Sequence, residues 1–368
     1  MQTLQTARCL WRALAPSFVL AAASLLAGGH AAAATYAYIS NADSQEISVL
    51  SLNPRNGELT PVETVKVGGN VMPLAVSPDK RVLYASLRSQ PFRVASFAID
   101  AGTGQLRKLG EASLADSMAN IATDRSGRWL FAASYGGNKI TVNSIGKDGA
   151  AGAVQQLITT APNAHSIQPD ASNRFVFATS LGGDNLSSWR FDDSAGVLSA
   201  NDPALTKTRA KSGPRHFVFD RAQKFIYLLC ELDASLYVFA YDSAKGTLRE
   251  LQTTTTLPPG FAGKPWAADL HLSPDGRYLY ASERTSSTLT TFKVDAATGE
   301  LKTVGQVPTE KTPRGFAIDP SGHYLLATGQ DSHSVSVHAI DAANGSLSLL
   351  KRYPVGQNPN WVEIVELP

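Results

Sequence analysis

The chain has 368 residues, of which 43% are hydrophobic and 17% are charged, a composition that excludes a disordered protein. Its 33 Lys and Arg residues nearly balance its 31 Asp and Glu residues, so the sequence offers no basic surface for binding nucleic acid. The 29 Gly and 20 Pro residues, with few long apolar helical patterns, favour an all-β protein.

The first 34 residues have the pattern of a secretory signal peptide. Arg8 and Arg12 precede an apolar run at residues 18–27, and small residues up to Ala34 follow. The apolar run is too short to cross a bilayer core of roughly 30 Å, which argues against a membrane anchor. The pattern predicts cleavage after Ala33 or Ala34 and a periplasmic or secreted protein without a membrane anchor.

A short strand of aromatic and aliphatic residues recurs through the remaining segment, residues 35–368. The third residue of each copy marks it, and successive markers lie 46 to 53 residues apart. The seven markers are Tyr38, Tyr84, Phe131, Phe177, Tyr227, Tyr280 and Leu326. This period is the length of a four-stranded propeller blade, so the markers predict seven blades.

A hairpin glycine recurs with the markers, as in Gly57, Gly104 and Gly299, and supplies the positive φ of a tight turn. The first copy begins at the second strand of a unit, while residues 360–365 have the pattern of a first strand. We therefore predict a seven-bladed β-propeller of four-stranded antiparallel blades over residues 35–368. The C-terminal strand joins the N-terminal blade and closes the ring, which removes open sheet edges. A β-sandwich or a solenoid is the alternative fold.

Equivalent positions in the repeats predict a shared site at one end of the central channel. The first strand of each blade lines the channel, and its start lies beside the end of the second strand. Polar residues occur twelve positions before the marker or four positions after it. The candidates collected in this way are His165, Arg215, Arg314, Arg88, Tyr135, Glu231, Arg284 and Gln330.

Several arginines around one histidine and one glutamate suit an anionic substrate and acid–base chemistry. Guanidinium groups donate in pairs to carboxylate or phosphate, and one of them can stabilise an oxyanion. No nucleophile motif and no metal-ligand spacing occurs, so we expect no metal or cofactor and water as the nucleophile. The less specific interpretation is that the arginines and Glu231 form structural ion pairs. Asp269 and His271 are interpreted as an inter-blade hydrogen-bond pair, and Trp266 as a packing residue.

Six sequence motifs point to a known family. They are Gly213-Pro-Arg-His216, Cys230-Glu-Leu232, Trp266 through Gly276, Glu283-Arg-Thr285, Pro313-Arg-Gly-Phe316 and Gly329-Gln330. In combination they resemble the lactonase family of seven-bladed propellers, close to the bacterial propeller-type 6-phosphogluconolactonases. The resemblance extends from Tyr36 to Val365.

This resemblance implies hydrolysis of a sugar lactone, so the expected partner is a small molecule. The sequence contains no oligomer signal, and we expect a monomer. Related fungal members cyclise carboxymuconate with a histidine, a glutamate and arginines. Carried over by motif, the catalytic roles fall on His165, Glu231, Arg215 and Arg284. Either His165 or Glu231 accepts the proton of the attacking water.

The remaining candidates, Arg314, Arg88, Tyr135 and Gln330, are expected to bind the substrate. Arg314 and Arg88 would hold a distal phosphate or hydroxyl groups. Since the leader directs the chain out of the cytoplasm, an unphosphorylated aldonolactone is an alternative substrate.

Two other functions remain open at this point. One is a non-catalytic periplasmic propeller that binds an anion or a protein, because a fold alone specifies no chemistry. The other is a lactone-forming cycloisomerase of the carboxymuconate type. The presence of Glu231 among the arginines favours an enzyme, since an anion-binding site gains nothing from a carboxylate.

Overall fold

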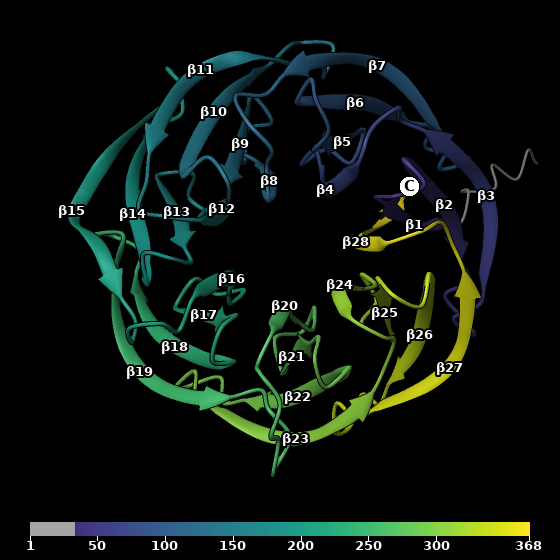
Figure 1. Ribbon diagram of the computed structural model, residues 1–368, viewed down its shortest axis with the longest axis vertical. Helices are drawn as coiled ribbons and strands as arrows, with labels where there is room; N and C mark the ends of the chain where they lie inside the picture. Colours follow the sequence, from purple (N-terminus) through teal and green to yellow (C-terminus); the bar gives the residue numbers. More distant parts are fainter. Residues whose placement is uncertain (1–33) are drawn as a thin grey trace, which may run out of the picture. The chain divides into compact units, whose positions relative to one another are not determined.

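The computed structural model describes residues 34–368, which form 28 β-strands and no helix. These strands make seven four-stranded antiparallel sheets arranged in a ring (Figure 1). The predicted all-β propeller is therefore confirmed, while residues 1–33 of the predicted signal peptide lie outside the described residues and Ala34 begins β1. Within residues 34–368, no helix has the length and apolar character needed to cross a membrane.

The strands follow one order in each blade, from the centre of the ring outward. The first two blades contain β28 (Pro359–Leu367), β1 (Ala34–Asn41), β2 (Glu46–Leu52) and β3 (Leu59–Lys66), then β4 (Val71–Val76), β5 (Val82–Leu87), β6 (Arg93–Ile99) and β7 (Leu106–Ser113). The third and fourth contain β8 (Asn120–Thr123), β9 (Trp129–Ser134), β10 (Lys139–Ile145) and β11 (Ala151–Thr159), then β12 (Ala164–Pro169), β13 (Phe175–Ser180), β14 (Asn185–Asp192) and β15 (Val197–Lys207). The fifth contains β16 (Pro214–Phe219), β17 (Phe225–Cys230), β18 (Ser235–Asp242) and β19 (Thr247–Thr255). The last two contain β20 (Ala267–Leu272), β21 (Tyr278–Glu283), β22 (Thr288–Val294) and β23 (Leu301–Pro308), then β24 (Pro313–Ile318), β25 (Tyr324–Gly329), β26 (Ser334–Ile340) and β27 (Leu347–Pro354).

The ring is closed as predicted, because the C-terminal β28 is the inner strand of the first blade. It pairs antiparallel with β1, with Tyr38 opposite Glu363 and Tyr36 opposite Val365. The two ends of the described chain thus share one sheet, and β1 is covered by β28 and is not an open edge strand.

The four marker tyrosines tie their blades to the next one through the recurring glycines. The hydroxyl of Tyr38 donates to the carbonyl of Gly104 in the second blade at 2.8 Å, and Tyr280 donates to Gly345 at 2.9 Å. Gly104 has φ +70°, and a Cβ there would lie 2.4 Å from the ring of Tyr36. The periodic glycine is thus required both by the turn and by the aromatic side chain of the preceding blade.

Apolar side chains fill the spaces between adjacent blades. In one such cluster, Tyr38 and Val49 of the first blade pack against Leu83 and Phe97 of the second, and all four are buried. The described residues contain one buried cysteine and no disulfide, so this packing holds the blades together.

Bulges near the start of the inner strands aim side chains at the centre of the ring. At the bulge in β12 the backbone hydrogen bonds to β13 are interrupted, and the side chain of Thr179 in β13 supplies a partner. Its hydroxyl accepts from the Ser166 amide at 2.9 Å and donates to the Arg215 carbonyl at 2.8 Å. Such irregularities reorient side chains next to functional sites. They fall between Val71 and Leu74, Ala164 and Ile167, Pro214 and His216, Ala267 and Leu270, and Pro313 and Phe316.

Candidate active site

Two arginines from neighbouring blades hold the carboxylate of Glu231. Nε of Arg215 and Nη2 of Arg284 each lie 2.8 Å from the same oxygen, Oε2. The side chains of both arginines are 1% exposed and that of Glu231 is 12% exposed. Nη1 of Arg215 also donates to the Ala268 carbonyl in the next blade. These contacts leave Nη2 of Arg215 and Oε1 of Glu231 without a partner among the described residues.

The guanidinium of Arg284 is fixed on three sides. It donates to the carbonyls of Trp266 and Ala267, each at 3.0 Å, and lies 3.9 Å from the centroid of the Trp266 ring. Trp266 is itself 43% exposed, so its interpretation as a packing residue is wrong: it is the exposed aromatic cover of Arg284.

Glu231 and Arg284 are charged at neutral pH. Burial acts to raise the pKa of Glu231, but Arg215 and Arg284 outweigh burial, and the pKa lies below its usual value. Burial and the nearby Arg215 lower the pKa of Arg284 to about 9. Glu231 is therefore an anion whose main contacts are two cations.

Two further arginines add positive charge to the same group. Arg88 donates to the hydroxyl of Ser117 at 2.7 Å and to the sulfur of Met72 at 2.9 Å. The side chain of Arg314 has no acceptor among residues 34–368. Burial, followed by repulsion from Arg215 and the other arginines, lowers the pKa of Arg314 well below its usual range. We refer to Arg88, Arg215, Glu231, Arg284, Arg314 and His165 as the channel mouth.

His165 lies on the inner strand next to that of Arg215 and is only 3% exposed. Burial and the charges of Arg215 and Arg314 lower its pKa well below the ordinary value, so the imidazole is neutral. The ring of the partly exposed Tyr135 meets it edge-on, with 6.0 Å between centroids. A neutral imidazole in this position can accept a proton.

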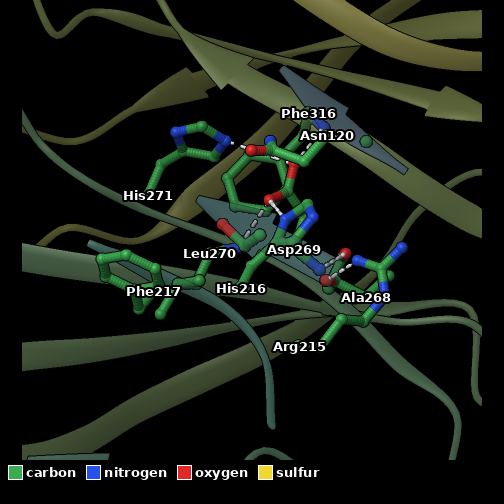
Figure 2. A network of polar contacts seen from close by, with 12 residues as sticks. Asn120, Arg215, His216, Phe217, Ala268, Asp269, Leu270, His271 and Phe316 are labelled. Atoms are coloured by element: carbon green, nitrogen blue, oxygen red, sulfur yellow. Dashed lines mark hydrogen bonds and ion pairs between the residues drawn. The ribbon is translucent and has the colours of Figure 1, made fainter. Parts of the chain in front are cut away.

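Behind the mouth, Asp269 links two histidines (Figure 2). Its Oδ1 lies 2.8 Å from Nδ1 of His216, in the neighbouring blade, and its Oδ2 lies 3.2 Å from Nε2 of His271. The expected inter-blade bond of Asp269 therefore exists, but its partner is His216, while His271 lies on the same strand as Asp269. A cavity of about 220 Å³ begins at these side chains and is also lined by Trp361 and Glu363.

Gln330 is the predicted site residue whose side chain bonds to a neighbouring loop and not to the other site residues. Its Nε2 donates to Oδ1 of Asn358 at 2.7 Å, in a contact between two loops. The structure thus brings His165, Glu231 and the four arginines together, places Tyr135 beside His165, and ties the Gln330 amide to the rim.

Sequence reasoning missed two residues of this region, His216 and Trp266. The repeat spacing selects a single position on each inner strand. On β16 this position is Arg215, so the next residue, His216, is not selected. The bulge in β16 makes both residues available to the channel, and no repeat spacing reveals a bulge. Trp266, which stacks on Arg284, ends the loop between β19 and β20. This loop is longer than the corresponding loops between the other blades, so the repeat gives no equivalent of Trp266.

Comparison with known proteins places these features in a family. The description "Lactonase, 7-bladed beta-propeller" belongs to the family profile that matches residues 30–364. The chain belongs to this lactonase family. The resemblance drawn from the sequence motifs is thereby confirmed.

Relatives of this lactonase include 6-phosphogluconolactonases of two bacteria. The protein of Pectobacterium carotovorum is 41% identical over 330 residues, covering 90% of this chain and 98% of the relative. That of Erwinia tasmaniensis is 41% identical over 282 residues, covering 77% and 84%. Among solved structures, the periplasmic gluconolactonase of Pseudomonas aeruginosa superposes with a TM-score of 0.85 at 30% identity, covering 91% of this chain and all of that one (100%).

Proposed function

We propose that this lactonase opens a six-carbon sugar lactone of the 6-phosphogluconolactone type to the corresponding acid. The observation that carries the proposal is the channel mouth, in which two guanidinium groups hold one carboxylate and two further arginines and a neutral histidine belong to the same charged group. The names of the relatives, 6-phosphogluconolactonase and gluconolactonase, support the same substrate class.

In the proposed mechanism, His165 is the general base. It removes a proton from water, whose oxygen forms a bond to the lactone carbonyl carbon. Free donors of Arg215 and Arg284 hold the resulting oxyanion. The bond between this carbon and the ring oxygen then breaks, and the imidazolium of His165 returns the proton to the leaving oxygen. Glu231 is a poorer base because its Oε2 accepts from both arginines and its pKa is lowered.

We assign the binding of the substrate's distal phosphate or hydroxyl groups to Arg314, with Arg88 beside it. Arg314 has no acceptor in the protein, and its charge is repelled by three other arginines. A phosphate would supply the missing acceptor in a bidentate contact. The leader favours an unphosphorylated aldonolactone as the second candidate, because phosphorylated sugars are made inside the cell.

The test is a panel of lactones followed in a pH-stat with the purified mature protein. We expect 6-phosphogluconolactone and D-glucono-1,5-lactone to open faster than in the enzyme-free buffer, and Glu231→Gln to be slower than wild type. Absence of turnover on the panel, with stabilisation by gluconate or by peptides, would instead assign a binding protein. Formation of a lactone from carboxymuconate would assign the cycloisomerase.

We also propose that the leader exports the chain to the periplasm. Cleavage after Ala33 leaves β1 complete, because Ala34 pairs with Leu367, and cleavage after Ala34 removes only that one pair. We expect the periplasmic fraction of a Gram-negative host to contain a form whose N-terminal residue is Ala34 or Thr35, by intact mass. The control is Leu25→Arg, which places a charge in the apolar run and should retain the precursor in the cytoplasm. A cytoplasmic wild type that keeps Met1 would contradict export.

A further inference from the structure

Two histidines of neighbouring blades, His165 in the channel mouth and His216 behind it, meet edge to face. The rings of His165 and His216 lie with centroids 5.0 Å apart at 64°. Each ring has one buried nitrogen without a hydrogen-bond partner: Nδ1 of His165 and Nε2 of His216. Nε2 of His165 is not among these buried atoms and has no hydrogen-bond partner in the described residues, so it is the ring nitrogen open to a ligand.

Asp269 determines which nitrogen of His216 carries the proton. Besides both histidines, its carboxylate accepts from the backbone amides of Leu270 at 3.0 Å and Phe316 at 3.3 Å (Figure 2). Burial acts to raise the pKa of Asp269, but its histidine contacts outweigh burial and the pKa lies far below the usual value. An ionised carboxylate only accepts hydrogen bonds. The proton of neutral His216 is therefore on Nδ1, and its Nε2 carries a lone pair.

We propose that Asp269 and His216 are positioning residues that fix the tautomer of His165. The lone pair on Nε2 of His216 favours a proton on Nδ1 of His165, which leaves Nε2 of His165 as the acceptor that faces the mouth. The two nitrogens share no direct hydrogen bond in the structure, so this contact requires a rotation of one ring or a bridging water between them. The kinetic part of this inference rests on the proposed lactone hydrolysis.

The charges around both groups are consistent with this role. The cations Arg215, Arg284 and Arg314 lie around His165 and oppose a positive charge on its ring. When His165 takes the proton of water, the proposed contact from its Nδ1–H to His216, which is backed by the Asp269 anion, offsets part of that repulsion. On the far side, Asp269 faces His271 and Glu363, and burial raises the pKa of Glu363 to about 7, so that part of its population is neutral.

A purely structural role for His216 is the competing explanation. The same ring packs edge-on against Trp361, with centroids 5.7 Å apart, as well as against His165. Two substitutions separate the explanations. His216→Phe keeps an aromatic ring but removes the acceptor, whereas His216→Gln loses the ring but offers an oxygen to His165 and an N–H to Asp269.

We expect His216→Phe to lower kcat about tenfold with little change in KM, a part of the roughly 10²–10⁴-fold that a well-placed general base contributes. His216→Gln should keep most of the wild-type kcat although it is the less well packed variant. The melting temperatures of both are measured alongside. A phenylalanine variant with wild-type kcat, or two variants impaired in proportion to their lost stability, would overturn the proposal.

A measurement without substrate keeps the inference separate from the proposed function. ¹⁵N NMR of histidine-labelled protein distinguishes protonated from bare ring nitrogens. We expect His165 to carry its proton on Nδ1 in wild type and in His271→Gln, which alters another partner of Asp269, and to lose that preference in His216→Phe. A wild-type His165 protonated on Nε2 refutes the inference whether or not any lactone is hydrolysed. An inactive protein with the expected tautomer refutes only the lactonase function.

Discussion

Replacing Arg215 by alanine is expected to lower kcat for lactone opening by about 10²–10³-fold, the usual consequence of removing one oxyanion donor. Arg215 is one of two arginines that join Glu231 to the next blade, since its Nε contacts the Glu231 carboxylate and its Nη1 the Ala268 carbonyl. The measurement is kcat for 6-phosphogluconolactone and for glucono-1,5-lactone, taken well below the melting temperature of each variant.

The same substitution also destabilises the fold, so the two effects have to be separated. Breaking a buried ion pair costs about 3–5 kcal/mol when one charge is left without a partner, and here Arg284 still pairs with Glu231, which reduces the cost. A matched control is Arg352→Ala, which removes an arginine 2.8 Å from the buried Glu310 outside the channel mouth. This control should lose stability and keep kcat.

Arg215→Lys adds a second comparison. It keeps the positive charge but loses the planar pair of donors, so its kcat should lie between those of wild type and alanine. If Arg215→Ala keeps full kcat below its melting temperature, the role assigned to Arg215 in holding the oxyanion is wrong.

The architecture was predictable because a propeller repeats its constraints seven times. The marker tyrosines and the hairpin glycines recur together since each hydroxyl reaches a glycine carbonyl in the adjacent blade, as Tyr38 reaches Gly104. One weak local signal becomes strong when it recurs at a fixed interval. The ring closure by β28 was predictable because the first copy of the repeat lacks its first strand, and the C-terminal residues have the pattern of that strand.

The site was predictable only where a side chain occupies an equivalent position in each blade. Arg215, Arg314 and His165 share one position, and Glu231 and Arg284 share another, so spacing alone assembled them. The contact between His216 and Asp269 depends on bulges in β16 and β20, where the register shifts by an amount that the spacing does not encode. Gln330 occupies the same position as Glu231, but a neighbouring loop supplies Asn358 as its partner.

Replacing Arg314 by methionine is expected to raise KM for 6-phosphogluconolactone about 10–100-fold while kcat changes little, as loss of a charged hydrogen bond worth about 1.5–3 kcal/mol predicts. The KM for glucono-1,5-lactone should change much less, because that lactone has no phosphate to hold. Arg88→Met is the matched comparison, and its effect should be smaller, since Arg88 already donates to Ser117 and Met72. An equal rise of KM for both lactones would contradict the phosphate assignment and would indicate that Arg314 contacts the lactone ring.

The melting temperature of the Arg314→Met variant is an independent test of the role of Arg314. A partly buried cation that lacks an acceptor and is repelled by Arg215, Arg284 and Arg88 destabilises the ligand-free protein. Arg314→Met should therefore raise the melting temperature without ligand and reduce the additional rise that phosphate or 6-phosphogluconate causes in wild type. A structural arginine would behave in the opposite way, because its loss would lower the melting temperature of the free protein. The sign of this shift thus decides whether the unpaired guanidinium is present for the fold or for the substrate.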